Sequence, residues 1–216
     1  MKNRKVQFVV FILLALALEF IPFINIPLKW LETYFHEISH GIAAIATGGT
    51  VVSIRLNPNG SGLCISRGGW PVLISLSGYL GAAFWGWLII AISEKKVQLA
   101  RIFSIMTFIL FFISLVLWAR DVLSILILLC LLSLNLLMIR KLDHTWLKAI
   151  LLFIGISVIL NAIKSPWYLI DGQAVGDGAS LAELTFIPEV VWIFIWMLAG
   201  LYGLYLSWRG LYASRN

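Results

Sequence analysis

The sequence predicts an all-α polytopic membrane protein, with six or seven membrane helices and one small β-hairpin after the second of them. Of the 216 residues, 61% are hydrophobic and 12% are charged, whereas a soluble domain is about half apolar and about a quarter charged. So few polar side chains cannot cover a soluble globule of this size. No long polar stretch is available for a second domain, so we expect residues 1–216 to form a single integral membrane domain.

Seven apolar segments predict the membrane helices, because most are close to the roughly 20 residues that a helix needs to cross a bilayer. They are residues 6–28, 30–47, 70–92, 101–118, 122–139, 147–163 and 187–207. Pro22 and Pro27 are expected to end or bend the first segment, because proline lacks the amide donor of a helical residue. In the fifth segment, Asn135 is expected to make an interhelical hydrogen bond.

The distribution of lysine and arginine indicates whether segment 30–47 crosses the membrane. If all seven segments cross and the N-terminus is cytoplasmic, the cytoplasmic side holds seven of the 16 basic residues, against the positive-inside rule. If segment 30–47 does not change sides, the cytoplasmic side holds eleven. These are Lys2, Arg4, Lys5, Lys95, Lys96, Arg101, Arg140, Lys141, Lys148, Arg209 and Arg215. The distribution favours six crossings and a second segment that enters the membrane without traversing it.

Residues 48–69 have a different character from the apolar segments around them. Residues 50–56 are rich in β-branched side chains, residues 57–62 are dense in turn formers, and residues 63–66 can return as a second strand. This pattern predicts a hairpin at 50–66. An open hairpin cannot lie bare in lipid, because its edge groups would lack hydrogen-bond partners, so we expect it at the interface or in a protein-lined cavity.

Segment 30–47 contains the motif His36-Glu37-Ile38-Ser39-His40. On a helix, His36 and His40 lie one turn apart on one face, where both imidazoles can bind one Zn²⁺. Glu37 lies beside them, placed to take a proton from a water molecule, as in the H-E-x-x-H motif of zinc proteases. Ionisable groups in a membrane segment are costly and usually mark a functional site. This cost favours a zinc centre over solvated side chains at a helix end.

A catalytic zinc site needs a third protein ligand and an open position for water. The remaining histidine, His144, lies in a charged connection and is a weaker candidate than two aspartates in the long connection 164–185. Asp171 and Asp177 are each followed by a glycine, which lets the backbone approach a site closely. The residues leave the choice between these two aspartates open, and either can instead be an ordinary turn residue.

The motif, together with Gly48-Gly49 and with Gly78-Tyr79-Leu80-Gly81, resembles the site-2 protease group of intramembrane zinc metalloproteases. Residues 177–192 resemble its compact branch, the M50B-like peptidases. The resemblance spans most of residues 30–197. It implies an intramembrane metalloendopeptidase with zinc as its cofactor.

The resemblance also implies a role for individual residues. His36 and His40 would bind zinc, and Glu37 would be the catalytic base. The resemblance offers two candidates for the third ligand. Ile170-Asp171-Gly172 resembles the ligand sequence of the wider group and implies Asp171, whereas the resemblance to the compact branch implies Asp177. We slightly favour Asp177. Two departures stand out: Ser39 replaces the usual glycine, and the Asn-Pro before the group's Asp-Gly is absent, which leaves Asn161 as a weak stand-in.

The hairpin at 50–66 gains a role from this resemblance. A substrate helix hides its peptide bonds in internal hydrogen bonds, so it must unwind before hydrolysis, and a strand edge near the zinc can hold the unwound segment by β-augmentation. The expected partners are therefore a membrane-protein or peptide substrate and the lipid bilayer. Nucleic acid is not expected, because the basic residues lie between apolar runs as topology signals. We expect a multi-pass protein of the cell membrane.

Two other functions compete with a protease. A catalytically silent relative that binds or escorts membrane proteins would lack some of the catalytic residues, and here only the third ligand is uncertain. A transporter would show repeated halves with paired broken helices, which this sequence lacks. The intact motif favours the enzyme.

Overall fold

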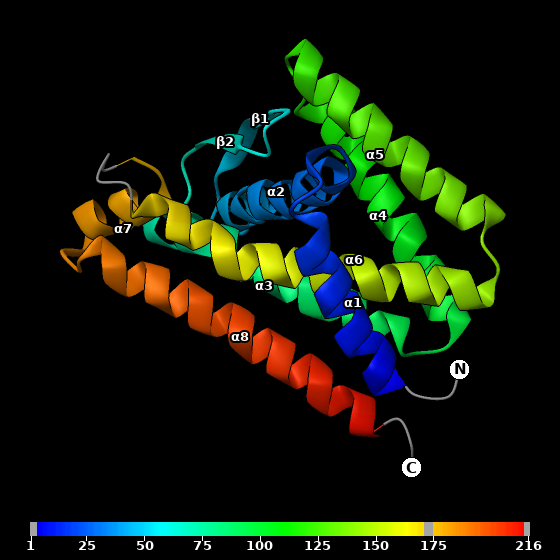
Figure 1. Ribbon diagram of the computed structural model, residues 1–216. Helices are drawn as coiled ribbons and strands as arrows, with labels where there is room; N and C mark the ends of the chain where they lie inside the picture. The colour runs from blue at the N-terminus through cyan, green and yellow to red at the C-terminus, as the bar shows by residue number, and fades with distance from the viewer. Residues whose placement is uncertain (1–3, 171–174, 214–216) are drawn as a thin grey trace.

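The computed structural model describes residues 4–170 and 175–213, and in this part of the chain the expected helical fold with one hairpin is confirmed (Figure 1). In chain order its elements are α1 (Arg4–Leu18), α2 (Pro22–Ala46), β1 (Thr50–Leu56), β2 (Gly62–Arg67), α3 (Pro71–Ser93), α4 (Val97–Leu117), α5 (Val122–Lys141), α6 (His144–Lys164), the 3₁₀ helix η1 (Ser165–Leu169), α7 (Asp177–Thr185) and α8 (Glu189–Ala213).

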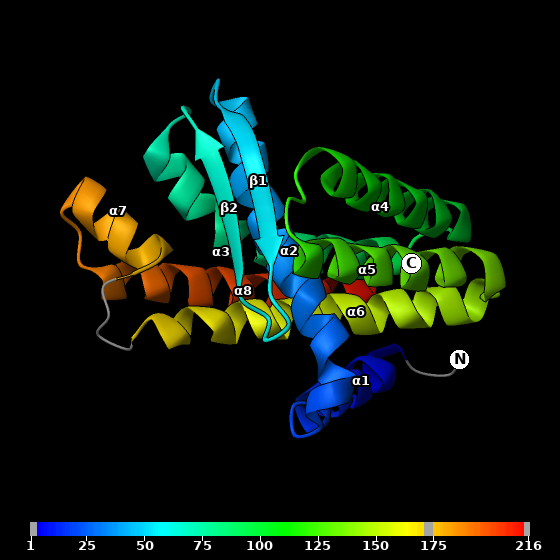
Figure 2. The same cartoon turned by 90° about the horizontal axis from the view of Figure 1, so that it is seen from above.

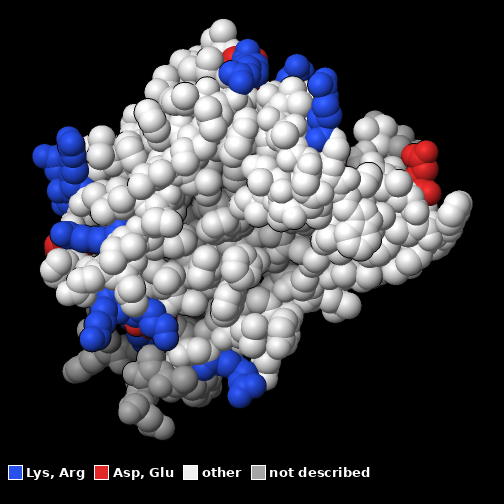
Figure 3. Space-filling view, turned by 180° about the vertical axis from the view of Figure 1, so that it is seen from behind, with Lys and Arg blue, Asp and Glu red and all other residues white. Residues whose placement is uncertain are grey.

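Five membrane spans can be recognised in the described residues by length and apolarity: α3, α4, α5, α6 with η1, and α8. Helices α1 and α2 meet at a bend of 108°, and together they form a sixth span if the bent pair is one broken or re-entrant span. Figure 3 shows a broad face whose middle is almost free of charge, with Lys and Arg near its rim, as a lipid-facing surface requires.

The break between the first two segments lies earlier than the sequence suggested. The first helix was expected to reach residue 28, but it ends at Leu18, and Pro22 starts α2 instead of ending α1. Proline fits the first turn of a helix, because the amide that it lacks would have no helical partner there. Pro27 lies inside α2 without ending it.

Side-chain contacts show which ends of the helices lie together. Arg4 at the start of α1 forms an ion pair of 3.6 Å with Glu94, just beyond the end of α3. Lys5 lies over the ring of Trp208 in α8, and Figure 1 shows both termini at this end. At the opposite end, Glu19 pairs with Lys164. If these two ends face opposite sides of a membrane, α1 and α2 together cross it once, which is the arrangement that the distribution of basic residues favours.

Helix α2 runs across the direction of α5, α6 and α8, with the hairpin alongside it (Figure 2). Its inner face is held by Tyr34, whose hydroxyl lies 2.8 Å from that of Ser114, and by Phe35, whose ring stacks on Trp85 at 5.2 Å. These contacts fix the rotation of α2 about its axis. The turn of helix that follows them therefore faces α3.

The predicted hairpin is present, with β1 and β2 paired antiparallel from Thr50↔Arg67 to Leu56↔Gly62 and a bulge at residue 52. The outer edge of β1 is closed by the connection between α4 and α5. The Ile54 amide donates to the Trp118 carbonyl at 3.0 Å, and the Leu56 amide donates to the Ser124 hydroxyl at 2.8 Å. The edge that would be costly in lipid is thereby satisfied by protein.

The start of α5 is fixed by its N-cap, Asp121. This carboxylate accepts hydrogen bonds from the amide of Ser124 at 2.9 Å and from its hydroxyl at 2.7 Å. Desolvation raises the pKa of Asp121, but these hydrogen bonds and the charge of Arg55 outweigh it, so the pKa lies below its usual value. Asp121 thus orients the same Ser124 hydroxyl that closes the edge of β1.

Candidate metal centre

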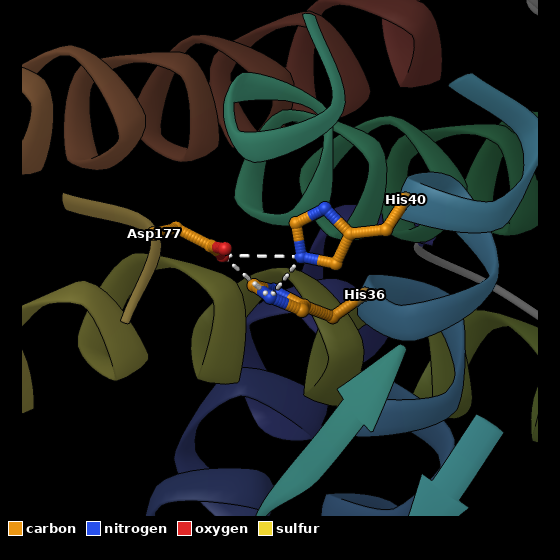
Figure 4. Close-up of side chains that lie close together, drawn as sticks. All are labelled: His36, His40 and Asp177. Carbon is orange, nitrogen blue, oxygen red and sulfur yellow. Dashed lines mark hydrogen bonds and ion pairs between the residues drawn. The ribbon is translucent and has the colours of Figure 1, made fainter. Parts of the chain in front are cut away.

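Helix α2 presents the two histidines of the motif side by side (Figure 4). Their four-residue spacing brings His36 Nε2 and His40 Nε2 to 3.0 Å from each other, with the rings edge to face. Glu37, one position after His36, is buried with them. The helical geometry that the motif implied is therefore present.

Asp177 joins the pair from the other end of the chain. It is the first residue of α7 and follows Gly176, whose φ of +104° is a conformation that glycine adopts without strain. Its Oδ2 lies 3.0 Å from His36 Nε2 and 3.1 Å from His40 Nε2. Asp171 lies outside the described residues, and His144 begins α6 at the end of the bundle far from the motif.

The three ligand atoms fit a zinc ion. They form a nearly equilateral triangle with sides of 3.0, 3.0 and 3.1 Å, close to the edge of about 3.3 Å expected for a tetrahedron with bonds of about 2.0 Å. Two imidazoles and a carboxylate are a donor set of catalytic zinc sites. Burial raises the pKa of Asp177, but hydrogen bonds and charges from both histidines outweigh it and hold the pKa well below its usual range. The carboxyl group is therefore ionised, as a metal ligand must be.

Helix α3 packs against His36 and His40 and orients their rings. His40 Nδ1 lies 2.6 Å from the carbonyl oxygen of Ile74, so the ring donates there and leaves Nε2 free for a metal. A Cβ atom at Gly78 would lie 2.5 Å from Nε2 of both histidines. The glycine lets α3 approach, which explains why the Gly78-Tyr79-Leu80-Gly81 run accompanies the motif.

Ser39 departs from the family pattern without disturbing the site. Its hydroxyl donates to the Phe35 carbonyl at 2.6 Å, one turn earlier in α2. The side chain fits only because Gly81 faces it, since a Cβ at Gly81 would collide with the serine Oγ. The serine is thus accommodated by a glycine in the neighbouring helix.

Strand β2 passes directly over Glu37. A Cβ atom at Gly62 would lie 2.5 Å from Glu37 Oε1, and the backbone amide of Cys64 donates a hydrogen bond to this carboxylate. Burial, with the charges of Glu37 and Asp177, raises the pKa of the Cys64 thiol to about 12. The strand supplies a backbone partner for Glu37.

A cleft of about 690 Å³ opens onto the triad and onto Glu37. Three of its lining residues were not expected as site residues. Glu32 lies one helical turn before His36, Tyr79 places its ring 4.3 Å from the His36 ring, and Lys164 lines the cleft while paired with Glu19. Two of the three could have been found from the sequence. Glu32 is at helical spacing from His36, and the glycine before Tyr79 indicates that its helix approaches another closely. No local pattern predicts that Lys164 belongs to the site. Asn161, the weak stand-in, also lines the cleft.

The family assignment rests on a match over most of the chain. A family model described as Peptidase M50B-like matches residues 9–207. The chain belongs to the Peptidase M50B-like family. Comparison with curated proteins and with solved structures gave no match.

Family membership supports a protease in a multi-pass membrane fold. The match spans the motif helix of this M50B-like peptidase, the hairpin and α7, so all three residues of the triad lie inside the matched region. The family assignment predicted from the motif, the glycine runs and residues 177–192 is thereby confirmed.

Proposed function

We propose that this M50B-like peptidase is a zinc-dependent endopeptidase that hydrolyses a peptide bond of a membrane-protein substrate in or near the bilayer. The observation that carries the proposal is the meeting of His36, His40 and Asp177 within 3.1 Å beside a buried Glu37. These three residues would hold the zinc. When bound, the ion lowers the pKa of water and polarises the scissile carbonyl.

Glu37 is the proposed catalytic base. One of its carboxylate oxygens accepts a proton from the attacking water and later delivers it to the nitrogen of the leaving amine. The Cys64 amide donates a hydrogen bond to this side chain, and the absence of a side chain at Gly62 leaves room for it. The carboxylate is buried between α2 and β2 and borders the cleft, through which the attacking water can reach it.

The outer edge of β2 is the proposed substrate-binding edge. Alternate residues of an antiparallel strand present their backbone groups to opposite sides, and the Cys64 amide points to Glu37, so the edge groups of Gly62, Cys64 and Ser66 face away from β1. Among the described residues, no other strand pairs with β2. An unwound substrate segment can add to this edge and pass the triad in an extended conformation.

The proposed location is the cell membrane, with the N-terminus in the cytoplasm. The end that carries Arg4 and Lys95 then faces the cytoplasm, as the positive-inside rule requires. Glu19, Lys164 and α7 lie towards the opposite end, so the triad would lie in the half of the bilayer away from the cytoplasm.

Zinc content and cleavage together test the function. The purified protein in nanodiscs should hold about one zinc per chain, and His36→Ala should lose it. Glu37→Gln should keep the zinc but fail to cleave a library of transmembrane peptides that the wild type cleaves, with products identified by mass spectrometry. Zinc content unchanged in His36→Ala would refute the metal site. Zinc binding without cleavage by the wild type would instead favour the silent, escorting role.

A further inference from the structure

Asn135 is a buried polar residue that the proposed function does not use. It lies in the membrane span α5 and is 9% exposed. The expected interhelical hydrogen bond is not made by its side-chain oxygen: Oδ1 is buried and has no partner in the described part of the chain. Because an unsatisfied polar group in a membrane interior is costly, a partner from outside the chain is implied.

The Asn135 side chain lines a cavity of about 310 Å³ that is partly open to the outside. The cavity is lined by α2, α4, α5 and α6 with Ile89 of α3, and most of its walls are aliphatic and aromatic. We call it the α4–α5 cavity, and it is lined by Pro27, Leu28, Leu31, Phe35, Ile89, Phe103, Ser104, Thr107, Phe111, Leu131, Leu134, Asn135, Met138, Ile150, Leu151, Phe153 and Ile154.

The remaining polar groups of this cavity are already engaged as donors. The Ser104 hydroxyl donates to the Ala100 carbonyl and the Thr107 hydroxyl to the Phe103 carbonyl, each at 3.0 Å. A buried water typically makes about three hydrogen bonds, and cavities lined by apolar side chains stay dry. The cavity is therefore better filled by an apolar molecule than by water.

The lining also limits the headgroup and size of that molecule. No charged residue lines the cavity, so an ionised carboxylate or phosphate inside it would be unpaired and unfavourable. Its volume is at the lower end of the roughly 300–1,000 Å³ of small-molecule sites, which suits one alkyl chain better than a two-chain lipid. Leu134 is 43% exposed, so the cavity reaches the lipid-facing surface and a lipid can enter laterally.

We propose that the α4–α5 cavity binds a single-chain lipid with a neutral hydroxyl group, such as a long-chain alcohol. The hydroxyl donates to Asn135 Oδ1, and the alkyl chain packs against Phe111, Leu131 and their neighbours. Leu31 and Phe35 bring the bound chain against α2 on the side away from the metal triad. This inference stands independently of the proposed protease activity.

Photolabelling tests the site directly. The full-length protein in nanodiscs is illuminated with a long-chain alcohol that carries a diazirine on its chain, or with the matching methyl ether, which cannot donate. We expect the alcohol to label peptides from α4 and α5 about tenfold more efficiently than the ether, because one buried acceptor is left unpaired without it. Asn135→Leu should remove this preference while the ether still labels.

A pair of tryptophan variants provides the matched control. Leu134→Trp places a large ring at the cavity opening and should abolish labelling of α4 and α5. Leu137→Trp, in the same helix and 55% exposed, should leave labelling unchanged, because Leu137 does not line the cavity. Equal labelling by alcohol and ether in the wild type, or labelling insensitive to Leu134→Trp, would overturn the inference. An unchanged melting temperature in all variants would show that the fold is intact.

Discussion

The most direct test of the metal centre is the substitution Gly78→Ala, which adds a single methyl group beside the two histidines. The new Cβ would lie 2.5 Å from Nε2 of His36 and 2.5 Å from Nε2 of His40, where ordinary contacts lie at 3.4–4 Å. Both nitrogens would have to move by about 1 Å, several times the roughly 0.2 Å within which metal–ligand distances hold. Gly78→Ala is therefore expected to weaken zinc binding more than it destabilises the fold.

Two displaced ligands should weaken zinc binding by at least about a hundredfold, or about 3 kcal/mol. The measurement is a competition titration with a zinc chelator on purified protein. Gly210→Ala is the matched control, because a Cβ there meets nothing within 4 Å, and it should bind zinc like the wild type. Wild-type zinc affinity in Gly78→Ala would refute the placement of the two histidines against α3.

Three further outcomes are expected. Gly62→Ala should keep its zinc but lose cleavage by about a hundredfold, because the new Cβ displaces the catalytic carboxylate; an unchanged cleavage rate would contradict the position of β2. Asp177→Ala should abolish zinc retention and Asp171→Ala should spare it, as measured by metal analysis, and the reverse result would make Asp171 the ligand. Asp121→Asn should lower the melting temperature at neutral pH. Because the folded pKa of Asp121 is depressed, its stabilisation is present above about pH 4 and is lost as the pH falls through the folded pKa, so the two melting curves should converge in acid.

The features that the sequence predicted well are those encoded by local periodicity. The four-residue spacing of His36 and His40 fixes their relation on any helix, and runs of about 20 apolar residues identify membrane spans whatever their packing. The hairpin could also be predicted from the sequence, because turn formers separate the β-branched run 50–56 from the short run 63–66. In each case the signal and the structure lie within a few residues of each other.

Other features depend on contacts between distant residues and have no local signal. Asp177 meets His36 across 141 positions, and nothing in the Asp-Gly pairs tells which aspartate arrives there. The break after Leu18 could not be located, because Pro22 is as compatible with starting a helix as with ending one. The missing partner of Asn135 reflects how five helices leave a cavity between them, and no sequence pattern within α5 predicts it.

The two edges of the hairpin have different surroundings, and this difference bears on the proposed function. An unpaired strand edge attracts other chains and is normally blocked. The β1 edge is blocked by the Trp118 carbonyl and the Ser124 hydroxyl, and Asp121 is placed to keep that hydroxyl oriented. The β2 edge instead borders the cleft and lies over Glu37.

Closing the β1 edge satisfies groups that would be costly in lipid, and it also holds β1 in place against Trp118 and Ser124. Holding β1 rigidly keeps β2 at a constant distance from the triad. A substrate segment paired with β2 would then present its peptide bond at a fixed position. Ser124→Ala, which frees the β1 edge, should therefore slow cleavage without loss of zinc, whereas an equal rate would mean that the hairpin is only a connection.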